Sequence, residues 1–487
     1  MIDFSKIEQY RENNRIEAKK ALGGLPKSIW ETYSAFANTY GGIILLGVEE
    51  WADKSLHTVD LPDPDRLIKE FWDIVNNPNK TSVNVLSLKD VFVQEVDGDH
   101  IVVIRVPRAE RSYKPVYVDG NPLCTYRRNG EGDYRCTKEE YQAMVRDASV
   151  KTQDMLVLQE MDMQVFNKES IRSYRQRMRL SRPGHVWESL EEEEFLLKLG
   201  AVGIGTDGKK HPTSAGLLMF GNEYDIVREF NAYFLDYQEQ YDADTRWTDR
   251  IISSSGDWSG NVYDFYFRIY NKLIQDIKMP FKMDGGSRVD DTPVHQALRE
   301  ALANCLVHAD YYGRQGLVII KKRDCITMSN PGSFRIEIDA AKSGGISDPR
   351  NGAMLRMFNL IDIGERAGSG IPNIFRVWRE EGWTAPEITE QLEPERTTLT
   401  LTFEKKEKIG DKKSAIKIGD KKSAINIKMK ETIIEYLTDH AEDKASSIAD
   451  YIGLKPSRTR DYLNELITEG VVVAEGGNRN RTYKLKA

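Results

Sequence analysis

Residues 292–308, TPVHQALREALANCLVH, are predicted to form one helix with two distinct faces. A threonine N-cap followed by proline suits the start of a helix, and apolar residues then recur at helical spacing as a buried stripe. Glu300, Asn304 and His308 lie four residues apart, so they share a second stripe. This carboxylate–amide–imidazole row is either a solvated face or part of a site. In a site, the carboxylate can orient water and the amide oxygen can bind a hard cation.

Three segments downstream favour a site. Residues 324–332, DCITMSNPG, predict a strand that enters a turn. Residues 364–371, GERAGSGI, predict a glycine-rich loop that leads into a helix, where backbone N–H groups can bind an anion. Residues 397–403, TTLTLTF, predict a closing strand.

In this order the segments resemble the Bergerat-type (GHKL) ATPases, the superfamily of gyrase B and histidine kinases, and more narrowly the RecG-related ATPase-like module. The resemblance covers residues 290–405 and implies an α/β sandwich that binds ATP and Mg²⁺. It implies that Glu300 polarises the attacking water and that Asn304 binds Mg²⁺, with residues 344–366 as a lid. The other nucleotide-binding residues expected are His308, Asn330, Gly332, Gly368, Ser369, Gly370 and Thr398.

Asn330 departs from the superfamily pattern, which usually has an aspartate at this position. A neutral amide can still accept a hydrogen bond from the adenine amino group, but more weakly than a carboxylate. Binding of ATP is therefore expected more than efficient hydrolysis, and any Mg²⁺-dependent ATPase activity should be slow. A pocket that has decayed in an idle scaffold is the remaining alternative.

The N-terminal part contains a helix, a double-glycine stop and an apolar strand, in the segment AFANTYGGIILLGVEE at residues 35–50. With ENNRIEAKK at 12–20 and YRRNGEG at 126–132, it resembles the AlbA-like domain of Schlafen proteins and of many bacterial regulators. The resemblance covers residues 8–140 and implies an α/β domain that contacts nucleic acid.

In the Schlafen branch this domain can be an RNA endonuclease that uses three acids. Glu12, Glu17 and Glu50 (or Glu49) would occupy those positions, the third as a glutamate instead of an aspartate, and hold Mg²⁺ or Mn²⁺. The alternative is that the acids are structural and that Glu17 pairs with Lys19 or Lys20. Basic and tyrosine residues are interleaved over residues 105–135, which fits either a nucleic-acid surface or a solvated sheet. The candidate contacts in this part are Arg127 and Arg128.

Residues 151–289 are expected to bridge the flanking domains with helices and strands, including a strand at 212–221. The glycine-rich segment 203–210, GIGTDGKK, resembles a phosphate-binding P-loop. It has a lysine where serine or threonine should bind the metal, and a proline follows where a helix should begin. We therefore interpret it as a polar loop.

After residue 404 the composition changes. KIGDKKSAI occurs at 408–416 and again at 417–425, and residues 405–430 hold ten lysines and three acids. This basic linker is either a phosphate-contacting segment or a plain spacer. Residues 429–487 predict helices followed by a hairpin, the winged helix-turn-helix pattern, which would bind DNA, a protein or a sister subunit. The candidate DNA contacts are Ser457, Arg458, Arg460, Arg479 and Arg481.

The whole chain has 487 residues, a net charge of −7 and four cysteines without metal-site spacing. These values favour about three domains, nucleic-acid binding confined to local surfaces, and free thiols. No apolar run approaches the roughly 20 residues that span a bilayer, and no signal peptide is evident, so we expect a cytoplasmic protein.

Together these patterns predict an α+β multidomain chain that binds nucleotide and nucleic acid. The expected parts are an AlbA-like α/β domain (1–150), a helical/β bridging region (151–289), a Bergerat-type module (290–404), the linker (405–428) and a winged helix (429–487). The first hypothesis is an ATP-binding, DNA-binding transcriptional regulator that forms a homodimer or larger oligomer. The alternative is a Schlafen-like metal-dependent RNA endonuclease, in defence against phage, that uses the N-terminal acids.

Overall fold

The chain forms two compact units, residues 1–404 and residues 405–487. Among the described helices, none is long and apolar enough to cross a membrane. The computed structural model describes residues 2–241, 246–275, 283–284, 287–288, 292–364, 368–404, 433–434, 436–438, 440, 442–452, 459–460, 462–463, 466–467, 471–475 and 481–485.

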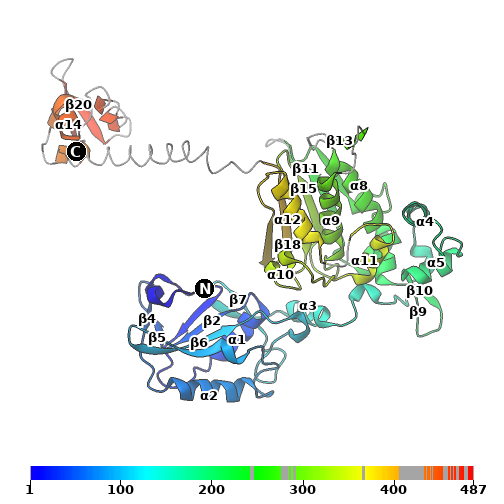
Figure 1. The fold of residues 1–487 in the computed structure, drawn as a ribbon, viewed down its shortest axis with the longest axis horizontal. Helices are drawn as coiled ribbons and strands as arrows, with labels where there is room; N and C mark the ends of the chain where they lie inside the picture. Colours follow the sequence, from blue (N-terminus) through cyan, green and yellow to red (C-terminus); the bar gives the residue numbers. More distant parts are fainter. Residues whose placement is uncertain are drawn as a thin grey trace. The chain divides into compact units, whose positions relative to one another are not determined.

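Residues 2–150, the N-terminal region, are built on a four-stranded sheet in the order β1-β2-β6-β5 (Figure 1). Side chains alternate across β2, so Ile44 and Leu46 pack with the helices while Leu45 packs on the opposite face. The sheet is therefore covered on both sides, as its almost continuous apolar sequence predicts. Its strands and main helices are β1 (Ile16–Lys19), β2 (Gly42–Leu46), β5 (Val91–Val96), β6 (Asp99–Val106), α1 (Ile29–Asn38) and α2 (Pro64–Val75).

Two hairpins and a helix complete the N-terminal region. In α3, Thr137 and Glu140 form a reciprocal capping box, which fixes where this helix begins. The elements are β3 (Val48–Glu50), β4 (Leu56–Thr58), β7 (Tyr126–Asn129), β8 (Gly132–Arg135), α3 (Lys138–Ala148) and the short turns η1 (Phe4–Gln9), η2 (Leu88–Asp90) and η3 (Arg111–Tyr113).

Residues 151–404, the central region, contain a six-stranded sheet in the order β12-β11-β15-β16-β18-β17. Only the β11–β15 pair is parallel. The segment expected to be a bridge therefore contributes two strands to the same sheet as the expected nucleotide module. The strands are β11 (Leu235–Glu239), β12 (Asp249–Ile252), β15 (Leu317–Lys321), β16 (Cys325–Pro331), β17 (Glu387–Leu392) and β18 (Glu395–Thr402).

Helix α9 (Pro293–Val307) lies at the centre of the helical layer and contacts both α8 and α12 (Figure 1). One hydrophobic core runs from Met161 to Leu401 and joins the helices to the sheet. The other elements are η4 (Gln153–Met155), η5 (Met163–Val165), α4 (Lys168–Ser181), α5 (Glu192–Leu199), α7 (Glu223–Glu229), η6 (Ser253–Ser255), α8 (Val262–Ile274), β13 (Met283–Asp284), β14 (Ser287–Arg288), α10 (Ile338–Ser343), α11 (Gly352–Asn359) and α12 (Gly370–Glu380).

One sequence prediction in this region is wrong. Residues 212–221 were expected to be a strand, but they contain helix α6 (Ser214–Phe220). Every residue of α6 is buried, so the sequence has no polar face to reveal the helical period. The Thr213 side chain accepts a hydrogen bond from Gly216 N and caps the helix. The preceding segment forms a small hairpin of β9 (Val202–Ile204) and β10 (Lys210–Pro212), which agrees with a loop instead of a P-loop.

The C-terminal unit has a three-stranded antiparallel sheet in the order β19-β21-β20 and the helix α14 (Ala445–Ile452). Ile433, Ile448, Leu463 and Tyr483 belong to its own core. The expected hairpin at 471–485 is present, whereas β19 was not anticipated. Its strands are β19 (Glu442–Lys444), β20 (Val472–Glu475) and β21 (Thr482–Leu485). The repeat linker, Ser457, Arg458 and Arg479 lie outside the described residues.

Candidate functional site

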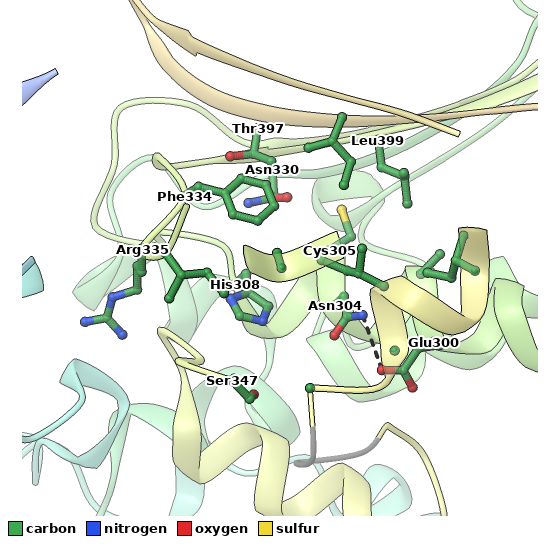
Figure 2. A pocket seen from close by; sticks show the side chains of 18 of the residues that line it. Glu300, Asn304, Cys305, His308, Asn330, Phe334, Arg335, Ser347, Thr397 and Leu399 are labelled. Atoms are coloured by element: carbon green, nitrogen blue, oxygen red, sulfur yellow. Dashed lines mark hydrogen bonds between the residues drawn. The ribbon is translucent and has the colours of Figure 1, made fainter. Parts of the chain in front are cut away.

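A cavity of about 110 Å³ lies between α9, α12 and the sheet. Glu300, Asn304 and His308 all line it, as their spacing on one helix stripe predicts (Figure 2). The opposite stripe of α9, including Leu298 and Leu302, is buried in the hydrophobic core. The helix therefore presents a polar row to the cavity while its apolar face holds that row in place.

The cavity has a polar side and an apolar side. Asn304 Nδ2 donates to Glu300 Oε1 at 3.3 Å, so these two side chains form one polar group on α9. A large apolar wall gives room for a flat aromatic ligand such as a purine base. Its apolar members are Met328, Phe334, Ile336, Ile346, Ile374 and Leu399.

Gly368 and Gly370 bring the start of α12 to the same cavity. A Cβ atom on Gly370 would lie 2.1 Å from Glu300 Oε1, so only glycine lets the carboxylate lie this close to the helix N-terminus. Gly368 has a φ of +66°, in the left-handed region that favours glycine. The glycine-rich sequence therefore provides close backbone approach here, as expected for an anion site.

Asn330 also lines the cavity and is buried, with its Nδ2 donating to Pro331 O at 3.3 Å. Thr398 does not line it, because its hydroxyl bonds with Ser329 Oγ across the strand pair. The neighbour Thr397 lines the cavity instead and donates to Gly332 O at 3.0 Å. Adjacent residues of a strand face opposite sides, so an error of one position in the register exchanges the two threonines.

Gly332 and Ser369 are near the cavity but do not line it. Gly332 has a φ of +97°, and the Arg350 guanidinium fills the space that a side chain would need. Ser369 is the N-cap residue of α12. Both therefore shape the backbone around the cavity.

His308 is neutral at physiological pH. Burial, together with the nearby cations Arg350 and Arg335, lowers its pKa to about 4. An uncharged imidazole cannot bind phosphate as a cation, so His308 can contribute only hydrogen bonds from the wall of the cavity. The oxygens of Glu300 and Asn304 are of the kind that Mg²⁺ prefers, so this pair fits one hard cation that keeps part of its water shell.

The lining residues that were not singled out from the sequence include Phe334, Arg335, Asp348 and Thr397. Phe334 and Arg335 follow the turn directly after Asn330-Pro331-Gly332, which was the available signal. Figure 2 shows the Phe334 ring pointing into the cavity and the Arg335 guanidinium pointing away from it.

The three N-terminal acids are neighbours; Glu12 accepts a hydrogen bond from Ala18 N, and the other two are paired with basic side chains. Burial raises the pKa of Glu12, and the carboxylates of Glu17 and Glu50 add to this effect. Glu17 pairs with Lys19 and Arg128, each at 2.8 Å, and Glu50 pairs with Lys54 at 3.2 Å. Across the described residues, no group of three acidic, histidine or cysteine side chains is arranged to hold a metal ion. This geometry favours the structural interpretation of the acids.

The two arginines proposed for nucleic acid in this region are also engaged. The Arg128 guanidinium is fully buried between Glu17 and Asp133, so none of its faces is open to a phosphate. Arg127 pairs with Glu140 and Glu393. In the C-terminal unit, by contrast, Arg460 and Arg481 are exposed.

Four family models match parts of the chain. Residues 12–137 match the model described as Schlafen, AlbA_2, and residues 317–401 match "Putative ATP-dependent DNA helicase recG C-terminal". Residues 142–236 match a domain of unknown function (DUF8451), and residues 429–475 match the FaeA-like protein model. No curated protein matches the chain.

The solved structures that match the chain include one that covers a part of it and one that covers nearly all of it. A solution structure of the N-terminal domain of a putative ATP-dependent DNA helicase RecG-related protein from Nitrosomonas europaea has 31% identity and a TM-score of 0.23; the match covers 28% of this chain and 95% of that one. A crystal structure of a Corynebacterium diphtheriae protein has 15% identity and a TM-score of 0.41, covering 97% and 92%. By its family matches, the chain contains a Schlafen AlbA_2 domain and a RecG-related C-terminal ATPase-like domain.

Proposed function

We propose that this protein is an ATP-binding, nucleic-acid-binding regulator whose nucleotide state controls its nucleic-acid-binding parts. The observation that carries the proposal is the cavity in which Glu300 and Asn304 meet the glycine-rich start of α12. The lining residues from Met328 to Leu399 fall within the ATPase-like match at 317–401, whereas Glu300 and Asn304 precede it on α9. We infer a Bergerat-type site from this combination.

In this proposal each side of the cavity has a separate role. Asn304, with Glu300, would hold Mg²⁺, which would neutralise phosphate charge and orient the phosphates. Glu300 would also polarise a water molecule for slow hydrolysis. The N–H groups of residues 368–370 would bind phosphates at the N-terminus of α12. Asn330 and Thr397 would bind the base against the apolar wall.

The C-terminal unit is the proposed DNA-binding part. Its three-stranded sheet, α14 and the FaeA-like match support a winged helix. Arg460 and Arg481 are exposed and would contact phosphates or bases. We further propose that two copies act together on two half-sites of DNA.

The nucleotide part of the proposal is tested by thermal unfolding with and without Mg-ATP. A ligand at 100 times its Kd stabilises the state that it binds by about 2.7 kcal/mol, so the wild-type Tm should rise. Asn304→Ala should lose this rise because it removes the proposed metal ligand. Asn271→Ala, an exposed asparagine on α8 outside this cavity, is the matched control and should retain it.

The same experiment can contradict the proposal in two ways. A wild-type Tm that does not respond to millimolar Mg-ATP would exclude a working nucleotide site. If the rise in Tm persists in Asn304→Ala, Mg-ATP binds at a place that does not depend on Asn304.

A further inference from the structure

The loop of residues 107–114, which follows β6, joins the N-terminal region to the wall of the cavity. Arg108 donates two hydrogen bonds to the Glu390 carboxylate, at 2.6 and 2.8 Å, and a third to Phe334 O at 2.8 Å. Phe334 N in turn donates to Glu390 Oε1 at 2.7 Å. The Glu390 side chain is only 2% exposed, so this charged pair is shielded from water. The backbone of Phe334 is thus held by an arginine of the N-terminal region.

A second arginine of the same loop reaches the cavity wall at Asp348. Arg111 donates to both oxygens of the Asp348 carboxylate, and Asp348 lines the cavity. Arg111 Nη1 also donates to the carbonyls of Asp147 and Ser149, where α3 ends. One guanidinium therefore connects a lining carboxylate with the last turn of the N-terminal region.

Phe334 and Arg335 connect the cavity with the same place on α3. Their side chains point in opposite directions, with the ring in the cavity and the guanidinium away from it (Figure 2). Arg335 donates to Asp147 O at 2.9 Å and to Pro349 O at 3.0 Å. Its side chain is 4% exposed, so it has little freedom to absorb a movement of the backbone. A residue whose ring lies in the cavity is therefore followed directly by a buried arginine anchored to α3.

We propose that the cavity wall formed by residues 333–335 and Asp348 transmits ligand binding to the N-terminal region through Arg108 and Arg111. This inference rests on the proposed function, because it takes the ligand to be a nucleotide. A ligand that contacts Phe334 and faces Asp348 changes the free energy of the contacts made by both arginines. By thermodynamic linkage the effect is reciprocal. If ligand binding changes the equilibrium for forming the contacts of Arg108 and Arg111 by some factor, forming those contacts changes the affinity for the ligand by the same factor.

The charge of Asp348 gives the direction of the effect. Arg111 neutralises this carboxylate, which would otherwise repel an anionic nucleotide. Arg111→Gln leaves Asp348 with only its longer pair to Arg335, at 3.6 Å, so the Kd for Mg-ATP should rise about fivefold. Adding Asp348→Asn removes the repulsion and should restore affinity, although the connection to the loop remains cut.

Arg111 is a better position for the test than Arg108. The side chains of Arg111 and Asp348 are 23% and 25% exposed, so water can compensate for part of a lost pair. Breaking the more deeply buried Arg108–Glu390 pair would leave a charge without a partner and threaten folding. Arg105→Gln is the matched control, because its guanidinium lies over the Phe92 ring within the N-terminal region.

The experiment combines calorimetric titration with Mg-ATP and amide hydrogen exchange of residues 108–114 in the full chain. In the wild type and in Arg105→Gln, Mg-ATP should slow exchange in this loop. In Arg111→Gln/Asp348→Asn, Mg-ATP should still bind, but the response of exchange in the loop should be smaller, because only the Arg108 contacts to Glu390 and Phe334 remain. That pattern would support transmission through Arg111.

The possible failures are distinguishable. If the wild type gives no binding heat with Mg-ATP, the proposed function fails and this inference fails with it. If Mg-ATP binds but exchange in residues 108–114 does not change, the proposed function stands and transmission is excluded. If the double variant still shows the wild-type response, Arg111 and Asp348 are not the route.

Discussion

Gly370 and Glu300 fit together so closely that neither tolerates a larger neighbour. The carboxylate occupies the space beside the first residue of α12, where a helix N-terminus favours negative charge. A phosphate group would seek the same environment. The position of Glu300 therefore depends on a glycine 70 positions away in the chain.

Replacement of Gly370 by alanine should destabilise the protein and weaken Mg-ATP binding. The added methyl group would overlap Glu300, and such overpacking typically costs about 1–3 kcal/mol. Gly352 is the matched control, since it is also the first residue of a helix and a Cβ there would meet no atom closer than 3.5 Å. Gly352→Ala should stabilise by about 0.4–1 kcal/mol. Urea unfolding measures both changes, and effects of equal sign would contradict the argument.

The residues that share one helix were predictable from sequence, and those that meet through tertiary contacts were not. Glu300, Asn304 and His308 follow from the period of α9 alone. Phe334 and Asp348 have roles that depend on the loop at 107–114, more than 200 residues earlier. The hydrophobic pattern of a segment predicts its own secondary structure but does not show which distant segment it will contact, so these contacts could not be predicted.

At the scale of elements, strongly patterned segments were predicted well and fully buried ones were not. Helix α9 and strands β16 and β18 lie where their sequences place them. The apolar segment at 212–221 is compatible with either a strand or a helix, and only its Thr213 cap separates the two. The pairing of β11 with β15 was also not predicted, since partners in a parallel pair need not be near in sequence.

A small cavity of about 30 Å³ lies between the 107–114 loop and the start of β18, and Lys114 and Glu395 are among the titratable groups that line it. Burial raises the pKa of Glu395 to about 7, and burial with the nearby Arg108 charge lowers the pKa of Lys114 to about 7. Both groups are therefore disfavoured in their charged forms. Because they share a cavity, the two titrations belong to the pair.

The contribution of Glu395 to the free energy of unfolding should fall as the pH rises from about 4.5 to 7, because folded Glu395 retains a proton that the unfolded chain releases. His308 acts in the opposite direction between about pH 4 and 6.5, because its unfolded imidazole binds a proton that the folded one does not. The slope from either group is at most about 1.4 kcal/mol per pH unit. Above pH 7 the free energy of unfolding should instead rise with pH, because the unfolded chain keeps the Lys114 proton that the folded state loses.

Urea unfolding from pH 5 to pH 9 measures this profile. The difference in the free energy of unfolding between the wild type and Glu395→Gln should fall from pH 5 to pH 7, while the difference for Glu387→Gln, at an exposed position on β17, should stay constant. A difference between the wild type and Glu395→Gln that does not change between pH 5 and pH 7 would show that Glu395 is ionised in the folded protein.

At the scale of the whole molecule, positive charge is concentrated while the chain as a whole is acidic. The net charge is −7, whereas residues 405–430 contain ten lysines and three acids.

Arg460→Ala and Arg481→Ala should each weaken DNA binding and reduce its salt dependence by about one unit of slope. Fluorescence anisotropy with duplex DNA over a salt series measures this, with Lys69→Ala, an exposed lysine on α2, as the control. Equal slopes for all variants would exclude the two arginines as phosphate contacts.

The fusion of β11 and β12 with the central sheet determines how the protein can be divided. A fragment that begins at residue 290 would lose β11 and expose one edge of β15, with its unpaired N–H and C=O groups. Such an edge recruits strands from other molecules, so the fragment would tend to aggregate or to form artificial dimers. The smallest piece suited to expression, crystallisation or transfer into a chimera is therefore the whole compact unit of residues 1–404, because a cut near residue 151 would also remove Arg108 and Asp147, the partners of the buried Glu390 and Arg350.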